Sequence, residues 1–480
     1  MAVAVAAPHP AAVEAAREVV ARGGNAFDAA LAAAGALTVA YPHQCSAGGD
    51  LVAIVRPAGG VPRAVLSIGA AAAGVDIAAL RAAGDRMPFD GPQTITVPGV
   101  VAGWAAIAGL GARLALSELL APAIRLATAG VPVSPGLRRA IAGRIDAIRS
   151  DPGLSALLLR GDDRLVQPVL AETLTAIGTD WRSFYEGDLA RRLAAGLGRL
   201  GSPIVAADLA AHRAEVVPPL TRALGEVVWH AAPPPVQGPT FLAVVGADDL
   251  LAASHRARQA RDARLGDPRT GPIDLDGMLA PDPGRAVAVD GAADGRRGPG
   301  TGAVRSDSAQ VGPKPAGDTV AVTAVDDDGI AVTLIQSVFG SFGSGLLDPG
   351  TGLVLHNRGS SFRLEPDHPG RIAPGSRPPH TLCPTMALTG GDVLALGCQG
   401  GRNQPWILAQ VAGEALGSDD LPGLLTRPRW FFDGTAVVTE PGVDALVDDA
   451  GHVQVSRLRA GRLASASDPR ADGRAAVLPG

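Results

Sequence analysis

The first forty positions carry apolar residues at helical spacing, interrupted once by a pair of glycines. Residues 11–22 predict an amphipathic helix that ends at Gly23-Gly24. The next run extends to about Thr38 and is rich in Ala and nearly free of charge, with Asn25 or Asp28 placed to cap a second helix. Because this second helix has no charged face to turn toward water, we expect it to be buried.

The pattern changes twice further along the chain. A short run of apolar residues, Leu51–Arg56, predicts a strand after a turn at Ser46–Asp50. Residues from about 100 to 260 are predicted to be mostly helical, with turns marked by Pro and Gly. From about Pro281 to Asp318 the chain is rich in Gly, Pro, Asp, Arg and Ser, a composition that predicts a disordered segment or a mobile linker.

After this linker the alternation typical of strands returns. Thr319–Val325 and Ile330–Ile335 flank Asp326-Asp-Asp-Gly329 and predict a β-hairpin with a Gly-bearing turn. The three aspartates favour a solvated turn over a calcium loop, because the terminal Glu of such a loop is missing. The glycine-rich run Gly340–Gly345 lacks the Lys of a phosphate-binding loop and the spacing of a hydrolase elbow, and a flexible turn is one reading of it.

The length, the hydrophobic content and the net charge of the chain exclude several classes of protein. The 480 residues are enough for a large core, and since 47% are hydrophobic but only 3% aromatic, Ala, Val and Leu must fill it. A net charge of −5 and the lack of a basic tract argue against nucleic acid or an anionic membrane as a partner. No apolar run reaches 18 residues and the N-terminus lacks a basic region, so we expect neither a membrane span nor a signal peptide.

Three cysteines, Cys45, Cys383 and Cys398, are far apart in the sequence. A sparse, odd number argues against a disulfide framework and is typical of a protein in the reducing cytoplasm. Neither the cysteines nor the nine histidines have the spacing of a zinc site, so we predict no metal and no cofactor.

Thr319 is the most informative position for function. It opens a strand directly after the low-complexity segment, which suggests a cleavage site between Asp318 and Thr319. Cleavage there would free an α-amine with a pKa of about 7.7–8.0, so that one residue would carry both a nucleophilic hydroxyl and a base. The alternative is an ordinary strand Thr, because Thr is favoured in strands.

A series of motifs runs through nearly the whole chain. In the first half they are Gly23–Ala30, Tyr41–His43 with Gly48-Gly49, Thr96–Gly99 with Gly103-Trp104, Phe184–Gly187, Ala207–Leu209, Pro233–Pro235 with Gly238, and Leu265–Pro268. In the second half they are Gly317–Thr319, Phe342–Gly345, Pro349–Gly352, Asn357–Gly359, His380–Pro384 and Gly397–Gly401. In this order they resemble the motifs of the gamma-glutamyltransferase (gamma-glutamyl transpeptidase) family of N-terminal-nucleophile (Ntn) hydrolases.

The resemblance implies a fold and a maturation step. The fold is α+β, a four-layer αββα sandwich of the Ntn hydrolase type. Members of the family are made as one precursor that cuts itself before the nucleophile, here between Asp318 and Thr319. Residues 1–318 and 319–480 would then stay together as one αββα unit, and a higher oligomer remains open.

The resemblance also implies roles for individual residues. By position, Thr319 is the nucleophile, and Ser337 is the hydroxyl residue that hydrogen-bonds it. Gly400 and Gly401 fall where backbone N–H groups form an oxyanion hole, and amides aimed at a developing oxyanion are typically worth about 3 kcal/mol each. The plainer alternatives are an ordinary Ser at a strand end and a simple glycine turn.

The chain departs from the family where gamma-glutamyl enzymes bind the α-carboxylate and the α-amine of the substrate. Those enzymes have an Arg in a stretch that corresponds to Ser67–Ala73, which contains none. Ser361 stands where they have an acidic residue, and Phe339 stands where they have an Asn. Losing a bidentate Arg–carboxylate contact and the partner of an ammonium weakens binding strongly, which argues against glutathione as the substrate.

Two segments near the implied site are more similar to the amidohydrolase-like branch of the family, the oxamate amidohydrolase type. They are Asn357-Arg358-Gly359 and His380-Thr381, the latter in place of two adjacent serines that contact the substrate in many members. Arg358 suits a small substrate carboxylate because its planar fork matches one. The alternatives are a surface Arg and a His380 packed as an ordinary polar residue.

Three hypotheses follow for function. The first is an autoprocessed Ntn amidohydrolase that cleaves a small-molecule amide through a threonyl acyl-enzyme and passes the acyl group to water. The second is a true gamma-glutamyl hydrolase or transpeptidase for glutathione-like substrates, with relocated groups such as Arg358. The third is a non-catalytic binding or scaffold protein, against which the presence of Gly317–Thr319 and Gly400-Gly401 argues.

Overall fold

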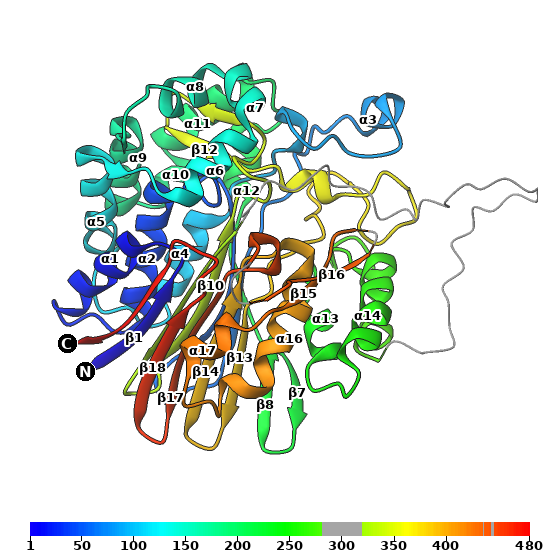
Figure 1. Ribbon diagram of the computed structural model, residues 1–480. Helices are drawn as coiled ribbons and strands as arrows, with labels where there is room; N and C mark the ends of the chain where they lie inside the picture. Colours follow the sequence, from blue (N-terminus) through cyan, green and yellow to red (C-terminus); the bar gives the residue numbers. More distant parts are fainter. Residues whose placement is uncertain (281–318, 435, 443–445) are drawn as a thin grey trace, which may run out of the picture.

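Two antiparallel β-sheets pack against each other at the centre of the molecule (Figure 1). The computed structural model describes residues 1–280, 319–434, 436–442 and 446–480. In order across the first sheet, the strands are β19 (Arg474–Pro479), β1 (Ala2–Ala7), β9 (Val320–Asp326), β10 (Ala331–Ser337), β2 (Asp50–Arg56), β3 (Arg63–Ser67) and β6 (Glu215–Val217). Those of the second are β18 (Arg462–Ser467), β17 (Val453–Arg459), β14 (Asp392–Cys398), β13 (Thr385–Thr389), β8 (Val227–Ala231) and β7 (Leu220–Leu224).

Both sheets combine strands from the two sides of Thr319. In the first sheet β9 and β10 lie between β1 and β2, and in the second β13 pairs with β8. Aliphatic side chains such as Ile54, Ile335 and Met386 fill the space between the sheets. Chain segments on either side of the predicted cleavage site therefore share one core.

Helices cover the outer face of each sheet. The long helices α1 (Pro10–Val20) and α2 (Ala26–Ala40) pack on the first sheet, and α13 (Gly238–Val244) and α16 (Gln404–Ala415) pack on the second (Figure 1). The other α-helices are α3 (Ile77–Ala83), α4 (Val100–Ala108), α5 (Leu116–Ala129), α6 (Pro135–Gly143), α7 (Ile145–Ser150), α8 (Pro152–Leu158), α9 (Pro168–Thr179), α10 (Ser183–Glu186), α11 (Asp188–Arg199), α12 (Ala206–Ala211), α14 (Leu250–Arg264), α15 (Leu275–Leu279) and α17 (Leu421–Thr426). Short strands and 3₁₀ turns complete the fold: β4 (Val131–Pro132), β5 (Arg164–Leu165), β11 (Leu346–Asp348), β12 (Leu353–Leu355), β15 (Trp430–Phe432), β16 (Val437–Thr439), η1 (Pro92–Thr94), η2 (Arg358–Ser361), η3 (Gly401–Asn403) and η4 (Asp448–Ala450).

The two predicted N-terminal helices are confirmed as α1 and α2. Every residue of α2 is buried, as its lack of a charged face indicated. Asn25 is the cap, since its side chain accepts hydrogen bonds from the amides of Phe27 and Asp28, and Asp28 returns a bond to the Asn25 amide. No helix among the described residues is both long and apolar enough to cross a membrane.

The prediction that residues from about 100 to 260 are mostly helical is confirmed by α4 to α14, but it missed the strands β6, β7 and β8 within residues 215–231. In β7 half-buried and exposed residues alternate, the period of a strand with one face toward water. Asp50 is not part of a turn but the first residue of β2. The predicted linker from 281 to 318 lies outside the described residues.

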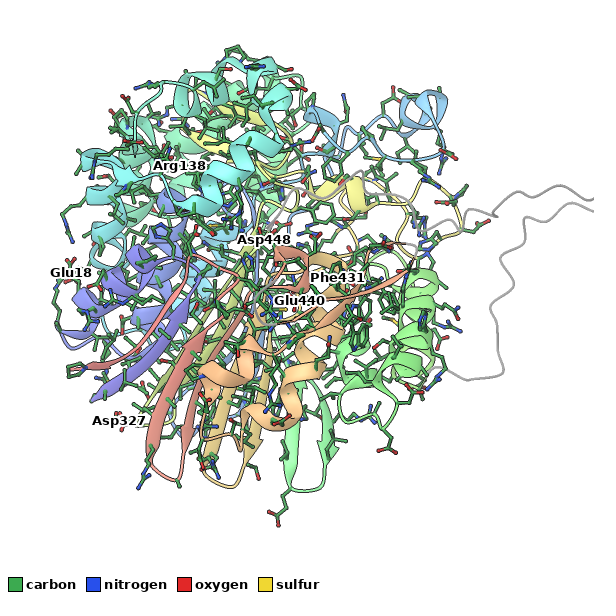
Figure 2. All side chains as sticks on the ribbon, in the orientation of Figure 1. Glu18, Arg138, Asp327, Phe431, Glu440 and Asp448 are labelled. Carbon is green, nitrogen blue, oxygen red and sulfur yellow. The ribbon has the colours of Figure 1, made fainter. Side chains whose placement is uncertain are left out.

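The hairpin after Thr319 is confirmed, but its turn is only partly solvated. Asp327 and Asp328 are exposed, and Asp327 lies at the outer end of the sheet (Figure 2). Asp326 is buried, and its carboxylate accepts hydrogen bonds from the amides of Ala26 and Ile330 at 3.2 and 2.9 Å. Burial raises the pKa of Asp326 to about 6. The first aspartate therefore joins the hairpin to α2.

Candidate active site

Three polar residues form a row at the ends of adjacent strands of the first sheet. Val320 pairs with Gln336, so Thr319 stands opposite Ser337, and Ser337 in turn pairs with Asp50. Residues that stand opposite each other on neighbouring strands point to the same face of a sheet. All three are buried, with Thr319 only 1% exposed.

The two hydroxyl groups of this row are hydrogen-bonded to each other. Thr319 Oγ1 and Ser337 Oγ lie 3.0 Å apart, and either atom can be the donor. Ser337 Oγ also accepts a bond from the backbone amide of Phe339 at 2.8 Å. The hydroxyl that the resemblance assigned to the nucleophile's partner is therefore held beside Thr319.

A small cavity is connected to this row through Phe339, which bonds Ser337, and His380, which contacts Asp50; Thr319, Ser337 and Asp50 do not themselves line it. Its volume is about 80 Å³, and its wall contains four of the residues predicted to bind substrate, Phe339, Ser361, His380 and Thr381. The remaining described residues of the wall are Phe89, Gln237, Arg261, Asp262, Leu265, Ser360, Arg363, His368, Pro379 and Arg402. Four residues that were predicted to bind substrate therefore line the same cavity. Their roles in binding are still predictions.

Arg358 lies behind the wall of the cavity and is completely buried. Its Nη1 donates to Thr381 Oγ1 at 3.0 Å, and its guanidinium carbon lies 4.1 Å from the centre of the Phe339 ring. Phe339 holds this position with a φ of 76°, a left-handed conformation that is uncommon for an aromatic residue. The alternative of a surface Arg is wrong, because the charge is enclosed between two residues that flank the site.

Gly400 lies between β14 and η3, and Gly401 is the first residue of η3. Their φ angles are 144° and 51°, and the first is a conformation that essentially only glycine adopts. Just before this turn, a Cβ added to Gly397 would lie 3.3 Å from the Cβ of Ala321, two residues after Thr319. The glycine turn therefore follows a strand segment that packs against the beginning of β9.

Gln237 connects the glycine turn to the substrate-binding side, and sequence reasoning missed it. Its amide nitrogen donates to the carbonyl of Thr381 and, at 2.9 Å, to that of Gly401, while its oxygen accepts a bond from Arg261 Nη1. Arg261 also donates to the carbonyl of Arg402. The available signal was its place inside the motif formed by Pro233–Pro235 and Gly238, directly before Gly238.

Asp50 and His356 are the other residues that sequence reasoning missed. Asp50 Oδ1 accepts a bond from the Gly69 amide at 2.9 Å, and Oδ2 lies 3.2 Å from His380 Nε2 and 3.4 Å from His356 Nδ1. Burial alone would raise the pKa of the Asp50 carboxyl, but the two imidazoles hold it well below its usual range. Burial, with Arg358 nearby, lowers the pKa of His380 to about 3. Asp50 is therefore ionised and His380 neutral at neutral pH.

The stretch that lacks the family's Arg is packed onto Asp50. Besides the bond from Gly69, Ser67 Oγ donates to the Gly99 carbonyl at 2.6 Å and lies 3.2 Å from His212 Nε2. A side chain at Gly69 would collide with Val97, whose carbonyl oxygen is 1.5 Å from the place of a Cβ. The backbone of this stretch is thus held against the buried Asp50 carboxylate. Among the described residues, no group of three or more His, Cys, Asp or Glu side chains is arranged to hold a metal ion.

Comparison with known proteins identifies the family. The model of the gamma-glutamyltranspeptidase family matches residues 12–478. The oxamate amidohydrolase proenzyme of Klebsiella pneumoniae is 37% identical over 98% of this chain and 97% of its own length, and the glutathione hydrolase-like YwrD proenzyme of Bacillus subtilis is 32% identical over 90% and 85%. The crystal structure of cephalosporin acylase from Bacillus halodurans superposes with a TM-score of 0.84 and 27% identity, covering 100% of this chain and 96% of that one. The resemblance drawn from the motifs is confirmed, and the chain belongs to the gamma-glutamyltranspeptidase family of enzymes.

Proposed function

We propose that this protein is an autoprocessed amidohydrolase in which Thr319 is the nucleophile and the substrate is a short amide whose acyl group carries a carboxylate. The observation that carries the proposal is the 3.0 Å hydrogen bond between Thr319 and Ser337 at the ends of adjacent strands. A second hydroxyl at this distance supports the proposal, because it can orient the nucleophile. The relatives named oxamate amidohydrolase proenzyme and acylase ACY 1 proenzyme support the same class of reaction.

The proposed reaction begins once Thr319 has a free α-amine. Its Oγ attacks the amide carbonyl and its α-amine takes the hydroxyl proton. The N–H groups at Gly400 and Gly401 stabilise the oxyanion. The carbon–nitrogen bond then breaks, the leaving amine takes the proton, and an ester to Thr319 remains. Water attacks this ester by the same route, which releases the acid and restores the hydroxyl.

The size and charge of the site support a short, anionic acyl group. The cavity of about 80 Å³ is small beside the roughly 300–1,000 Å³ of sites for drug-sized ligands. Arg358 is buried between Phe339 and Thr381, and a fixed guanidinium suits a single carboxylate. A substrate like oxamate, with one carboxylate next to its amide, fits both properties better than a tripeptide does.

We also propose the finer organisation of the mature protein. The order helices, sheet, sheet, helices supports the four-layer αββα sandwich expected from the resemblance. Residues 1–318 and 319–480 would remain one unit after cleavage at Asp318–Thr319, because each sheet contains strands from both. Asp318 lies outside the described residues. The cytoplasm stays our prediction for location, and the three cysteines are buried and free.

Intact-mass analysis of purified wild type and Thr319→Ala tests the proposal. Wild type should give fragments of about 32 and 16 kDa from a 48.2 kDa chain, the smaller one beginning with Thr319, while the variant stays whole and inactive. Thr323→Ala is a matched control, since Thr323 is a buried Thr of β9, the strand that begins just after Thr319, and it bonds Ser456 on the other sheet. A wild type that remains one chain, or a Thr319→Ala protein with normal activity, would overturn the proposal.

Substrate comparison then separates the first two hypotheses. Cut wild type should hydrolyse oxamate or a similar short amide acid with a higher kcat/KM than gamma-glutamyl-p-nitroanilide. The opposite order would favour a gamma-glutamyl hydrolase with relocated binding groups.

A further inference from the structure

Asp50 continues the row of the nucleophile by one strand. Because neighbouring strands lie about 4.8 Å apart, its backbone is roughly 10 Å from that of Thr319. Its side chain shares a face of the sheet with Ser337 and is fully buried. A carboxylate so close to a nucleophile acts on the charge of whatever substrate binds there.

The carboxylate of Asp50 is surrounded by one backbone amide and two imidazoles. Its hydrogen-bond and ion-pair partners among the described residues are the Gly69 amide and the imidazoles of His356 and His380. None of these is a guanidinium or an ammonium. The negative charge is therefore not neutralised by a permanent cation, and it reaches the wall of the cavity to which His380 belongs.

The position of Asp50 relates directly to the missing family Arg. The stretch Ser67–Ala73, where gamma-glutamyl enzymes have an Arg for the α-carboxylate, donates to Asp50 through the Gly69 amide. A gamma-glutamyl α-carboxylate placed at this stretch would meet the buried Asp50 carboxylate, and this juxtaposition of like charges would weaken its binding. The chain has not only lost an attractive group here but holds a repulsive one.

His380 connects Asp50 to the cavity, because it contacts the Asp50 carboxylate and lines the cavity wall. Its Nε2 faces the Asp50 carboxylate, so Nε2 carries the hydrogen, and Nδ1 is left to accept the Leu382 amide at 3.4 Å. The next residue, Thr381, is the one that accepts from Arg358. Negative charge on one side of His380 and positive charge on the other thus define the direction in which an anionic acyl group binds.

We propose that Asp50 is a specificity-determining and positioning residue that, together with His380, excludes gamma-glutamyl groups and directs the single carboxylate of a short acyl group toward Arg358. This inference rests on the proposed function, in which cut Thr319 performs the acyl transfer to water.

The test compares two substrates in wild type and Asp50→Asn. Asparagine keeps the shape and an oxygen for the Gly69 amide but removes the charge. The ratio of kcat/KM for oxamate to that for gamma-glutamyl-p-nitroanilide should fall by about tenfold or more, mainly through a lower KM for the gamma-glutamyl compound, because a repulsion in the bound state has been removed. Asp348→Asn is the matched control, since Asp348 is another fully buried Asp, and should leave this ratio unchanged.

The outcomes distinguish the inference from the proposed function. A cut, folded Asp50→Asn protein whose ratio stays within about twofold of wild type would overturn the role of Asp50 and leave the proposed function standing. An uncut wild type would overturn the proposed function itself. If the variant does not fold, competition on wild type decides: oxalate should inhibit oxamate hydrolysis more strongly than L-glutamate does, and the reverse order would overturn the inference.

Discussion

Two buried clusters of charged residues in this molecule differ in what their charges face. Around the buried Glu440, labelled in Figure 2, Arg470 donates to both Glu440 and Asp468, and Arg429 donates to Asp468. Their remaining donors reach the backbone carbonyls of Leu425, Arg427, Ala450 and Gly451. Guanidinium groups and carboxylates are matched inside the protein, and the cluster joins loops of the chain after Thr319.

The cluster around Asp50 is arranged differently. One ionised carboxylate is shared by two imidazoles, and one of them, His380, forms part of a cavity wall. The pair of clusters shows that burial of charge alone does not mark a functional site. The informative property is whether the charges are satisfied by each other or are directed at a space that a ligand can occupy.

The largest expected effect is on the free energy of unfolding, and it concerns the Glu440 cluster. Arg470→Met should lower the free energy of unfolding by about 3–5 kcal/mol, because it leaves Glu440 buried without its guanidinium partner. Denaturant unfolding measures this loss. Arg427→Met, which removes an exposed pair with Glu414, should cost less than about 1 kcal/mol. Equal losses in the two variants would show that the Glu440 cluster does not hold the fold together.

The next effect concerns activity rather than stability. Gly400→Ala should lower kcat by about 10²–10³-fold, because a side chain is strained at a φ of 144° and its Cβ would lie 2.7 Å from Ile407 Cδ1, which displaces the amides of the turn. Steady-state kinetics on the cut protein provides the measurement. Gly413→Ala in α16, where a Cβ meets nothing within 4 Å, is the control and should keep full activity. A normal kcat in Gly400→Ala would show that the Gly400 amide is not part of the oxyanion hole.

The sequence named single residues of the predicted active site but not the contacts among distant ones. Thr319 was singled out as the first residue of a strand after the low-complexity segment and Ser337 by its position in the resemblance, and the two residues are only 18 positions apart. Asp50 and His380 are 330 positions apart, and Gln237 and Gly401 are 164 apart. No local pattern links such pairs, since they meet only after strands and loops from both parts of the chain have packed.

The same reason explains why the strands β6 and β7 were not predicted. A helix such as α2 can be predicted from a continuous local pattern, with a cap at Asn25 followed by an apolar run. The strand β6 has only three residues, and β7 is half-exposed at the edge of its sheet. Such strands exist because of the neighbours they pair with, and that pairing is not visible in a short window of sequence.

A third substitution tests the positive end of the active-site cluster. Arg358→Lys keeps the charge but loses the planar fork that bonds Thr381 and stacks on Phe339, so KM for oxamate should rise by about 10–100-fold while self-cleavage continues. Arg363→Lys changes another Arg of the cavity region and serves as the control, with KM expected within about twofold of wild type. If both variants behave alike, the carboxylate is bound by the general positive charge of the cavity and not by Arg358.

The smallest expected effect lies in a third buried region, where a histidine has no strong partner. Burial lowers the pKa of His43 to about 3, with His452, His9 and Arg139 lowering it further and Asp448 opposing them. The unfolded chain binds a proton at His43 below pH 6.5, but the folded chain does so only near pH 3. Stability is therefore lost as the pH falls through this window, by about 1.4 kcal/mol per pH unit.

His43→Leu should remove this contribution. Between pH 8 and pH 5 the variant should lose about 2 kcal/mol less stability than wild type, whatever its constant packing cost, as measured by denaturant unfolding at both values. Val39→Ala, a nearby buried apolar change, should lower stability equally at the two pH values. An unchanged pH dependence in His43→Leu would mean that His43 takes up its proton in the folded protein as readily as in the unfolded chain. In that case both this region and the Asp50 cluster would hold an ionised group inside the protein. A neutral buried histidine would then not be the difference between them.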